Sequence, residues 1–164
     1  MIKTTDNFLT KKEFNELKLF ILNNGNFPWY LSNGINTLKD GEKQFYHYFY
    51  NNYSICSDFF KLLLPLLKKL KVNSLIKIKA NLLPKTESIV EYKYHTDVEI
   101  KDKNLIPKTA IFYLNTNNGF TLFKDSPNVN SVENKIVYFN ANLQHGGTTC
   151  TDESFRSVIN FNYY

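Results

Sequence analysis

Hydrophobic residues near the N-terminus follow a helical spacing. They recur every three or four residues and predict one apolar helical stripe, made of Phe14, Leu17, Phe20 and Ile21. Thr10 and Glu13 stand at the spacing of a capping box, in which each side chain satisfies a backbone N–H of the other. We therefore predict a helix that begins after Thr10 and ends at the run Asn23-Asn24-Gly25-Asn26.

A second helix is predicted to begin at Ser57-Asp58 and to continue through an apolar stretch. Pro65 interrupts this stretch, and a proline inside a helix removes a hydrogen bond and clashes with the preceding turn. We expect a kink at Pro65 or a division into two short pieces.

From Leu75 onward the hydrophobic period changes to two, which is typical of strands. This pattern predicts strands over residues 75–81, 89–95, 109–115, 120–123, 135–140 and 155–163. Turn sequences separate them, namely Asn117-Asn118-Gly119, Asp125-Ser126-Pro127-Asn128 and Gly146-Gly147. We predict one domain over residues 1–164, with mainly helical support in 1–74 and a β core in 75–164. The fold class is mainly β, a sandwich or barrel buttressed by N-terminal helices.

The last predicted strand has two different faces. Phe155, Ser157, Ile159, Phe161 and Tyr163 form a mainly apolar face suited to packing under the helices. The opposite face carries Arg156, Val158, Asn160 and Asn162. A charge and two amides are unusual in a core, so this face is predicted to line a pocket.

Three residues have the types and spacing of a metal site. His95 and Asp97 stand two residues apart, which on a strand directs both to the same side, and His145 follows about fifty residues later. Two neutral imidazoles and one carboxylate are the facial triad of non-haem iron(II) oxygenases. A histidine beside an aspartate in a surface loop is the common alternative, so the case depends on the rest of the pattern.

Arg156 is the only arginine among 20 basic residues and follows His145 on the polar face of the last strand. A planar guanidinium suits paired hydrogen bonds to the distal carboxylate of 2-oxoglutarate, a co-substrate of such oxygenases. The alternative is an ion pair with a surface carboxylate such as Asp152 or Glu153.

The segment from Ile76 to Tyr164 resembles the 2-oxoglutarate- and Fe(II)-dependent oxygenases, in particular their prolyl-4-hydroxylase-like branch and its small phage-encoded members. The resemblance is carried by Tyr94-His95-Thr96-Asp97, Ala110–Asn115, Gly119–Phe123, and Val137-Tyr138-Phe139 leading to His145 and Arg156. It implies a double-stranded β-helix, or jelly roll. It also implies that His95, Asp97 and His145 bind the iron.

The resemblance implies further contacts to the co-substrate. Arg156 takes the place of the residue that holds the distal carboxylate, and Tyr113 that of a tyrosine whose hydroxyl bonds the same group. Asn81 falls near a position that is usually tyrosine in relatives, which leaves its contact in doubt. Asn160 lies on the face of Arg156 and lines the same pocket by strand geometry, with a buried structural amide as the alternative.

The implied activity couples decarboxylation of 2-oxoglutarate by dioxygen, giving succinate and CO2, to hydroxylation of a substrate. The substrate stays open: a prolyl residue in a protein, a free amino acid, a nucleobase or a small metabolite. Three alternatives are a jelly-roll binding module without turnover, a zinc hydrolase with Glu99 as base, and a nucleic-acid demethylase. The net charge of +5 permits nucleic acid without favouring it, because the lysines are scattered.

His47, the two cysteines and the lack of a targeting segment say less about function. His47 lies in the aromatic run from Phe45 to Tyr50, where a place in the core is favoured over a substrate contact. Cys56 and Cys150 have no metal-finger spacing and leave one disulfide open. No leader peptide or membrane span is visible, so a cytoplasmic location, in a host cell if the gene is viral, is expected.

Overall fold

The structure is a computed structural model that describes residues 1–34, 43–98 and 104–164. The N-terminal part contains β1 (Lys3–Thr5), α1 (Lys11–Lys18), the π-helical turn η1 (Leu19–Asn23), β2 (Tyr30–Ser32), β3 (Gln44–Asn51) and β4 (Ser54–Ile55). Then come the 3-10 helix η2 (Asp58–Leu63), α2 (Leu64–Leu70), β5 (Leu75–Pro84) and β6 (Lys108–Tyr113). The chain ends with β7 (Phe120–Phe123), β8 (Ser126–Asn130), β9 (Ile136–Asn140), β10 (His145–Gly147) and β11 (Phe155–Tyr163).

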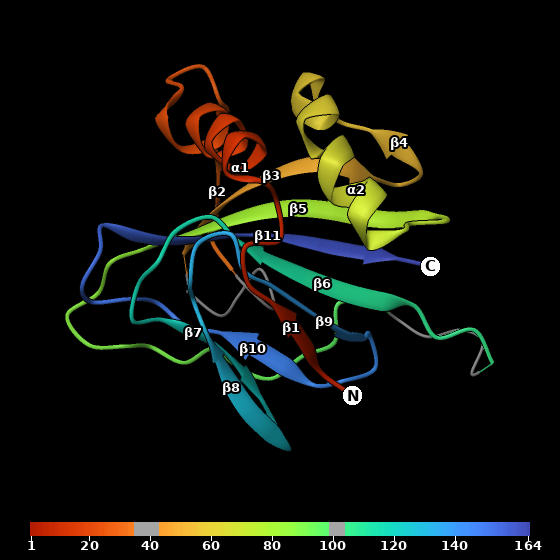
Figure 1. Ribbon diagram of the computed structural model, residues 1–164. Helices are drawn as coiled ribbons and strands as arrows, with labels where there is room; N and C mark the ends of the chain where they lie inside the picture. The colour runs from red at the N-terminus through yellow and green to blue at the C-terminus, as the bar shows by residue number, and fades with distance from the viewer. Residues whose placement is uncertain (35–42, 99–103) are drawn as a thin grey trace.

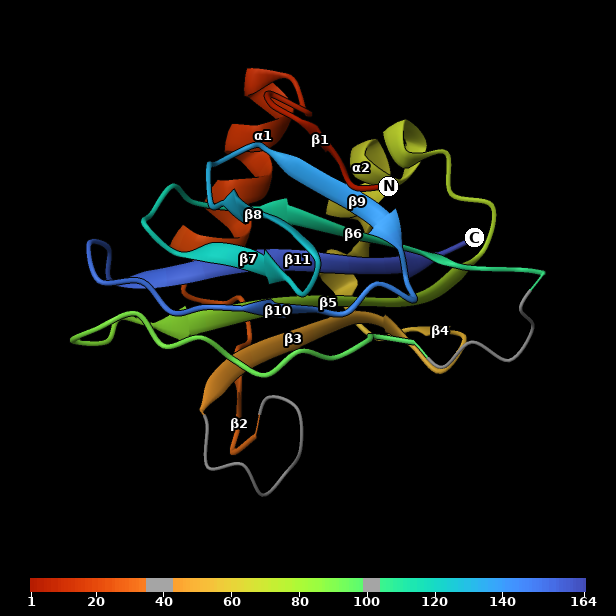
Figure 2. The ribbon, with the colours of Figure 1, turned by 90° about the horizontal axis from the view of Figure 1, so that it is seen from below.

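Two antiparallel sheets make up the β core in the described part of the chain. The larger sheet has eight strands, in the order β1-β9-β6-β11-β5-β3-β2 with β4 paired to β3. The smaller sheet has three strands in the order β10-β7-β8. Figure 1 shows α1 and α2 on one face of the larger sheet and the smaller sheet on the other, an arrangement also visible in Figure 2. This is the predicted jelly roll buttressed by helices.

The predicted helix signals are confirmed. The Thr10 hydroxyl accepts a hydrogen bond from the Glu13 N–H, and Glu13 accepts one from the Thr10 N–H, so α1 has its capping box. Ser57 caps η2 by accepting from the Phe59 N–H at 3.1 Å. The second helix is divided, as predicted, because Pro65 stands in the first turn of α2 directly after η2.

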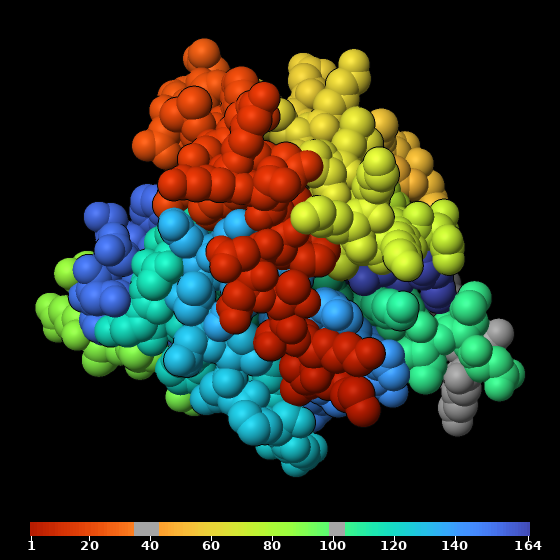
Figure 3. Space-filling model, viewed as in Figure 1, coloured from red at the N-terminus to blue at the C-terminus, as the bar shows by residue number. Residues whose placement is uncertain are grey.

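The core lies on both sides of the larger sheet. Alternate residues of β11 point to opposite sides of the sheet. Ile159 and Phe161 pack with the helices, and Val158 packs between the two sheets. Phe14, Leu17 and Ile21 are the buried residues of the predicted helical stripe, whereas Phe20 is exposed. Figure 3 shows the N-terminal segment crossing the front of the molecule below the helices.

Several predicted boundaries need correction. Residues 89–95 form no regular strand and pair only through the isolated bridges Glu91↔Thr148 and His95↔His145. Two predicted turns contain strands, because β8 begins at Ser126 and Gly146-Gly147 belong to β10. Residues 1–74 supply β1–β4 in addition to the helices, and the aromatic run around His47 is β3, which pairs with β5.

The disulfide left open by the sequence is not formed. Cys56 is exposed and Cys150 is buried, and neither forms a disulfide. Within the described ranges, no helix is long and apolar enough to cross a membrane.

Candidate metal centre and anion pocket

A backbone bridge brings His95 and His145 together. The His95 N–H donates to the His145 carbonyl at 2.9 Å, and the His145 N–H donates to the His95 carbonyl at 3.0 Å. His145 is the first residue of β10, and the bridge holds the irregular segment of His95 against it. The two imidazole centroids lie 4.9 Å apart as a result.

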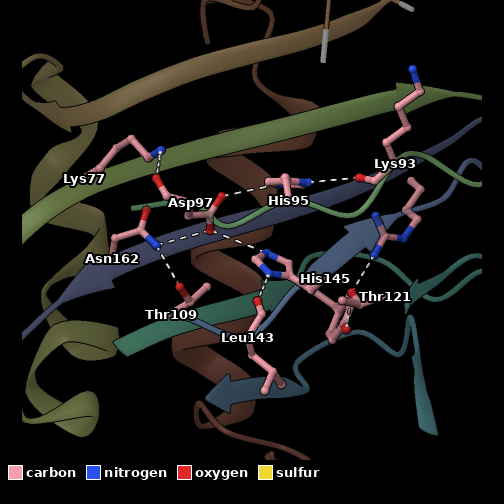
Figure 4. A network of polar contacts seen from close by, with 11 residues as sticks. Lys77, Lys93, His95, Asp97, Thr109, Thr121, Leu143, His145 and Asn162 are labelled. Carbon is pink, nitrogen blue, oxygen red and sulfur yellow. Dashed lines mark hydrogen bonds and ion pairs between the residues drawn. The ribbon is translucent and has the colours of Figure 1, made fainter. Parts of the chain in front are cut away.

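Asp97 completes a compact group of three side chains. Its Oδ1 lies 3.5 Å from His95 Nε2, and its Oδ2 lies 3.6 Å from His145 Nε2. One ligand atom from each of the three residues lies within 4.8 Å of the others. Figure 4 shows the two rings and the carboxylate converging. The structure thus places the three sequence-predicted ligands at one point.

The Nε2 atoms are presented by hydrogen bonds on the far side of each ring. Nδ1 of His95 lies 3.2 Å from the Lys93 carbonyl, and Nδ1 of His145 lies 3.1 Å from the Leu143 carbonyl. A carbonyl only accepts, so each Nδ1 carries the proton and each Nε2 keeps its lone pair. Such second contacts fix both tautomer and orientation in metal-binding histidines.

Asp97 is oriented by a neighbour from β11. Asn162 Nδ2 donates to Asp97 Oδ2 at 3.2 Å and to Thr109 Oγ1 at 3.0 Å (Figure 4). Burial disfavours the carboxylate, but the adjacent imidazoles of His145 and His95 outweigh it and hold the pKa of Asp97 well below its usual range. For His95, burial opposes protonation and Asp97 favours it, with the net result that the pKa of His95 is raised.

These residues fit a divalent metal ion. His145 Nε2 is buried and has no hydrogen-bond partner among the described residues, which is costly for a polar atom unless a ligand binds it. The 3.5 and 3.6 Å separations exceed the usual N–H···O distance of about 2.9–3.0 Å. Two imidazoles and a carboxylate suit iron(II) in the open facial geometry.

Arg156 is a buried cation without a carboxylate partner in the described part of the chain. Its side chain is almost fully buried, and its Nε donates to Ser131 Oγ at 2.7 Å and its Nη2 to Thr121 Oγ1 at 3.1 Å. Burial lowers the pKa of Arg156, which reflects the cost of removing the charge from water. Neither Asp152 nor Glu153 pairs with it, so the surface ion pair considered from the sequence is not formed.

Tyr113 lies behind this guanidinium rather than on the cavity wall. The Arg156 guanidinium carbon lies 5.7 Å from the centroid of the Tyr113 ring. The Tyr113 hydroxyl lies 2.8 Å from Thr121 Oγ1, the oxygen that also accepts from Arg156. Burial raises the pKa of Tyr113, so the phenol stays neutral.

One cavity of about 310 Å³ joins the metal ligands and Arg156. Asn81 and Asn160 also line it, and each has a buried Oδ1 without a hydrogen-bond partner among the described residues. The wall further includes Gln44, Tyr48, Lys77, Lys79, Leu83, Tyr92, Thr96, Ile111, Thr121, Gly146, Gly147 and Val158. The pocket predicted from the polar face of the last strand therefore exists.

Two glycines beside the site are required by close packing rather than by a tight turn. A Cβ on Gly146 would lie 2.8 Å from the Tyr92 carbonyl oxygen. A Cβ on Gly119 would lie 2.6 Å from the Thr149 carbonyl oxygen and 2.7 Å from Arg156 Cδ. Both positions let neighbouring chain segments approach the site closely.

Two pocket residues, Lys77 and Lys79, are not among the site residues predicted from the sequence. The alternation of β5 puts both on the face of Asn81. The alternation gives the shared face, but it does not tell whether that face meets water or lines a pocket. His47 does not line the cavity: its ring nitrogens contact the Pro28 carbonyl and the Ser57 hydroxyl, both at 2.8 Å. Glu99 lies outside the described residues.

Similar folds are found among solved structures. A viral collagen prolyl hydroxylase from Paramecium Bursaria Chlorella virus-1, in complex with 2-oxoglutarate, has a TM-score of 0.65 at 14% identity, with 98% of this chain and 94% of that chain covered. The two chains have the same fold. A Pseudomonas putida prolyl-4-hydroxylase has a TM-score of 0.63 at 13% identity, covering 99% of this chain and 91% of that one.

HygX from Streptomyces hygroscopicus, with nickel and 2-oxoglutarate bound, has a TM-score of 0.64 at 12% identity, covering 99% of this chain and 82% of that one. Sequence comparison adds nothing to this, since neither a protein-family model nor a curated protein matches the chain. At these identities the likeness establishes the fold, the jelly roll of 2-oxoglutarate oxygenases.

Proposed function

We propose that this protein is a 2-oxoglutarate- and Fe(II)-dependent dioxygenase. It couples conversion of 2-oxoglutarate and dioxygen to succinate and CO2 with hydroxylation of a substrate C–H bond. One observation carries the proposal: a buried arginine without a carboxylate partner among the described residues lines the same cavity as a His-Asp-His group. A metal ion and a dianion bound together satisfy both.

The metal is assigned to His95, Asp97 and His145. Bound iron(II) supplies the reaction with dioxygen, for which protein side chains have no equivalent. The chain supplies orientation: the Lys93 and Leu143 carbonyls fix the imidazoles through Nδ1. A zinc hydrolase with the same ligands would not account for the buried charge of Arg156.

The distal carboxylate of 2-oxoglutarate is assigned to Arg156. Ser131 and Thr121 fix the guanidinium at Nε and Nη2, which prepares it for binding and reduces the entropy lost there. Tyr113, the second donor expected from the sequence, does not line the cavity, so its proposed role is to support Arg156 through the Thr121 oxygen that both side chains contact. Asn81 on β5 and Asn160 on the adjacent strand β11 both line the cavity. We propose that their amides contact the co-substrate.

The first substrate to test is a prolyl residue. Two of the similar structures are prolyl hydroxylases, and the cavity wall here includes the uncharged residues Ile111, Leu83 and Val158 beside the ligands. The fold alone does not select a substrate, because one fold hosts many functions.

The test is succinate formation by the purified protein. We expect succinate from 2-oxoglutarate in air with iron(II), slowly without substrate, and none when iron is replaced by zinc or air by nitrogen. An Asp97→Ala protein should form none, while Asp125→Ala, at an exposed turn, should match wild type. If iron and 2-oxoglutarate both bind but no succinate forms with any candidate substrate, the protein is a binding module and the proposal fails.

A further inference from the structure

The pocket carries more positive charge than the proposed metal and co-substrate can use. Lys77, Lys79 and Arg156 line it, whereas Asp97 is the only carboxylate among the described lining residues. A divalent ion and the two carboxylates of 2-oxoglutarate carry equal and opposite charge. The three cations therefore still outweigh Asp97 by two charges when both are bound. Uncompensated charge in a partly buried pocket is costly, and an anionic ligand removes that cost.

Lys79 is the cation best placed to meet another ligand. Its ammonium lies 5.2 Å from the Tyr46 ring centroid and 5.7 Å from the Tyr48 ring centroid, and these two rings pack edge to face 5.3 Å apart. The ammonium thus has cation–π contacts with both rings but no carboxylate in ion-pair distance among the described residues. Burial and the neighbouring charge of Lys77 lower the pKa of Lys79 to about 8, and the charge of Asp97 offsets this only in part.

Lys79 is separate from the co-substrate anchor. Arg156 pairs with Leu83 across β11 and β5, whereas Lys79 lies four residues earlier on β5, opposite Asn160 and Tyr48. Four residues of strand span about 13 Å. Lys79 therefore belongs to the β3 side of the cavity, while the anion site around Arg156 is built from β11 and the smaller sheet with Thr121.

We propose that Lys79, whose ammonium lies over the rings of Tyr46 and Tyr48, binds a carboxylate of the substrate, so that this enzyme hydroxylates carboxylate-bearing molecules. This rests on the proposed function, because 2-oxoglutarate at Arg156 is what leaves Lys79 for the substrate. Lys77 adds a second positive charge to the same cavity wall. Its ammonium donates to the Asp97 carbonyl oxygen at 3.4 Å. The Tyr48 ring on the cavity wall supplies apolar surface for the carbon skeleton beside the carboxylate.

The experiment compares acids with matched amides. Iron(II)-loaded protein at saturating 2-oxoglutarate is given free L-amino acids, including L-proline, and each corresponding carboxamide, with succinate and oxygen-added product measured. A second arm uses the blocked dipeptides acetyl-Pro-Glu-amide and acetyl-Pro-Gln-amide. We expect at least one acid to stimulate succinate formation, with its amide weaker on the order of tenfold or more. The responding arm distinguishes a free amino acid from an acidic peptide.

Variants tie the effect to Lys79. Lys79→Met should abolish the preference for the acid, and Lys79→Arg should retain most of it. Lys85→Met, at an exposed lysine just beyond β5 and outside the cavity wall, should behave as wild type. If Lys79→Met does not fold, the acid–amide comparison in wild type and the Lys79→Arg protein still decides.

Three results would overturn the inference while leaving the proposed function intact: succinate forms but no acid stimulates it, amides stimulate as well as acids, or folded Lys79→Met keeps the preference. Absence of succinate under every condition, with iron and 2-oxoglutarate bound, instead removes the proposed function and this inference with it.

Discussion

Replacing Gly119 by alanine should damage both the stability of the protein and its anion site. The new Cβ would lie 2.6 Å from the Thr149 carbonyl oxygen, 2.7 Å from Arg156 Cδ and 2.9 Å from Asn117 Oδ1. None of these atoms can move freely. Thr149 is bonded to Val90 through its backbone N–H at 3.1 Å, and the guanidinium of Arg156 is held by two hydroxyls.

The size of the effect follows from two opposing contributions. Overpacking a closely packed site costs about 1–3 kcal/mol. Replacing glycine by alanine restricts the unfolded chain and returns about 0.4–1 kcal/mol. The net expectation is a loss of about 1–2 kcal/mol in the free energy of unfolding, or a Tm lower by roughly 2–8 °C for a chain of this length.

Two other glycines provide a graded control. A Cβ on Gly147 would meet only Arg156 Nη1 at 3.4 Å, and a Cβ on Gly25 would meet nothing within 4 Å. Stability should therefore fall least in Gly25→Ala, more in Gly147→Ala and most in Gly119→Ala.

The assays are thermal unfolding followed by circular dichroism and 2-oxoglutarate affinity measured anaerobically with iron(II). Because Gly119→Ala must displace the Arg156 stem, its affinity for 2-oxoglutarate should fall several-fold or more, whereas Gly25→Ala should match wild type. Equal Tm and equal affinity in Gly119→Ala and Gly25→Ala would refute the packing argument around Arg156.

Three further perturbations have expected outcomes. Arg156→Lys keeps the charge but loses the planar guanidinium. Its affinity for 2-oxoglutarate should fall on the order of tenfold or more, while its affinity for iron without co-substrate stays near wild type. Equal co-substrate affinities in two folded proteins would make Arg156 merely structural. Asn162→Ala removes a hydrogen bond to Asp97, so iron affinity in a metal titration should fall roughly 10–100-fold, and an unchanged affinity would exclude an orienting role. Burial lowers the pKa of His47 in the folded state, so the neutral imidazole stabilises the fold above the unfolded pKa of about 6.5, and this stability is lost as the pH falls below that value. In urea unfolding at pH 7.5 and 5.5, His47→Asn should lose less free energy of unfolding on acidification than wild type. Equal losses in the two proteins would contradict the assignment.

Much of the fold could be predicted from local patterns. Strands β7 and β11 have the predicted bounds, because turn sequences flank β7 and β11 has one mainly apolar and one mainly polar face. The capping box of α1 and the break at Pro65 are local effects that need no tertiary context.

The errors have physical causes. β3 is aromatic at nearly every position because both of its faces are covered, with Phe49 under the helices and Tyr48 on the cavity wall, so it shows no alternation. Residues 89–95 have the composition of a strand, but this segment leads into the metal site and pairs with the neighbouring chain through only two isolated bridges. β8 and β10 are short and contain Pro127 and two glycines, which read locally as turns.

In the site, too, local patterns predict some features, while others depend on tertiary contacts. The spacing of His95 and Asp97 predicted a shared direction, and the structure brings these two residues to His145 through a backbone bridge that no local pattern encodes. Lys79 could not be distinguished from a solvated lysine, because an alternating polar face looks the same whether it meets water or lines a concave pocket.

The central claim, that one cavity holds iron(II) and 2-oxoglutarate together, is tested most directly by an anaerobic titration. Wild-type protein is given one equivalent of iron(II) and then 2-oxoglutarate, and the visible charge-transfer absorption of the chelated metal is recorded, with Asp97→Ala measured in parallel. We expect a saturable band at one iron and one 2-oxoglutarate per chain that is absent in folded Asp97→Ala. No band in wild type, or the same band in Asp97→Ala, would contradict it.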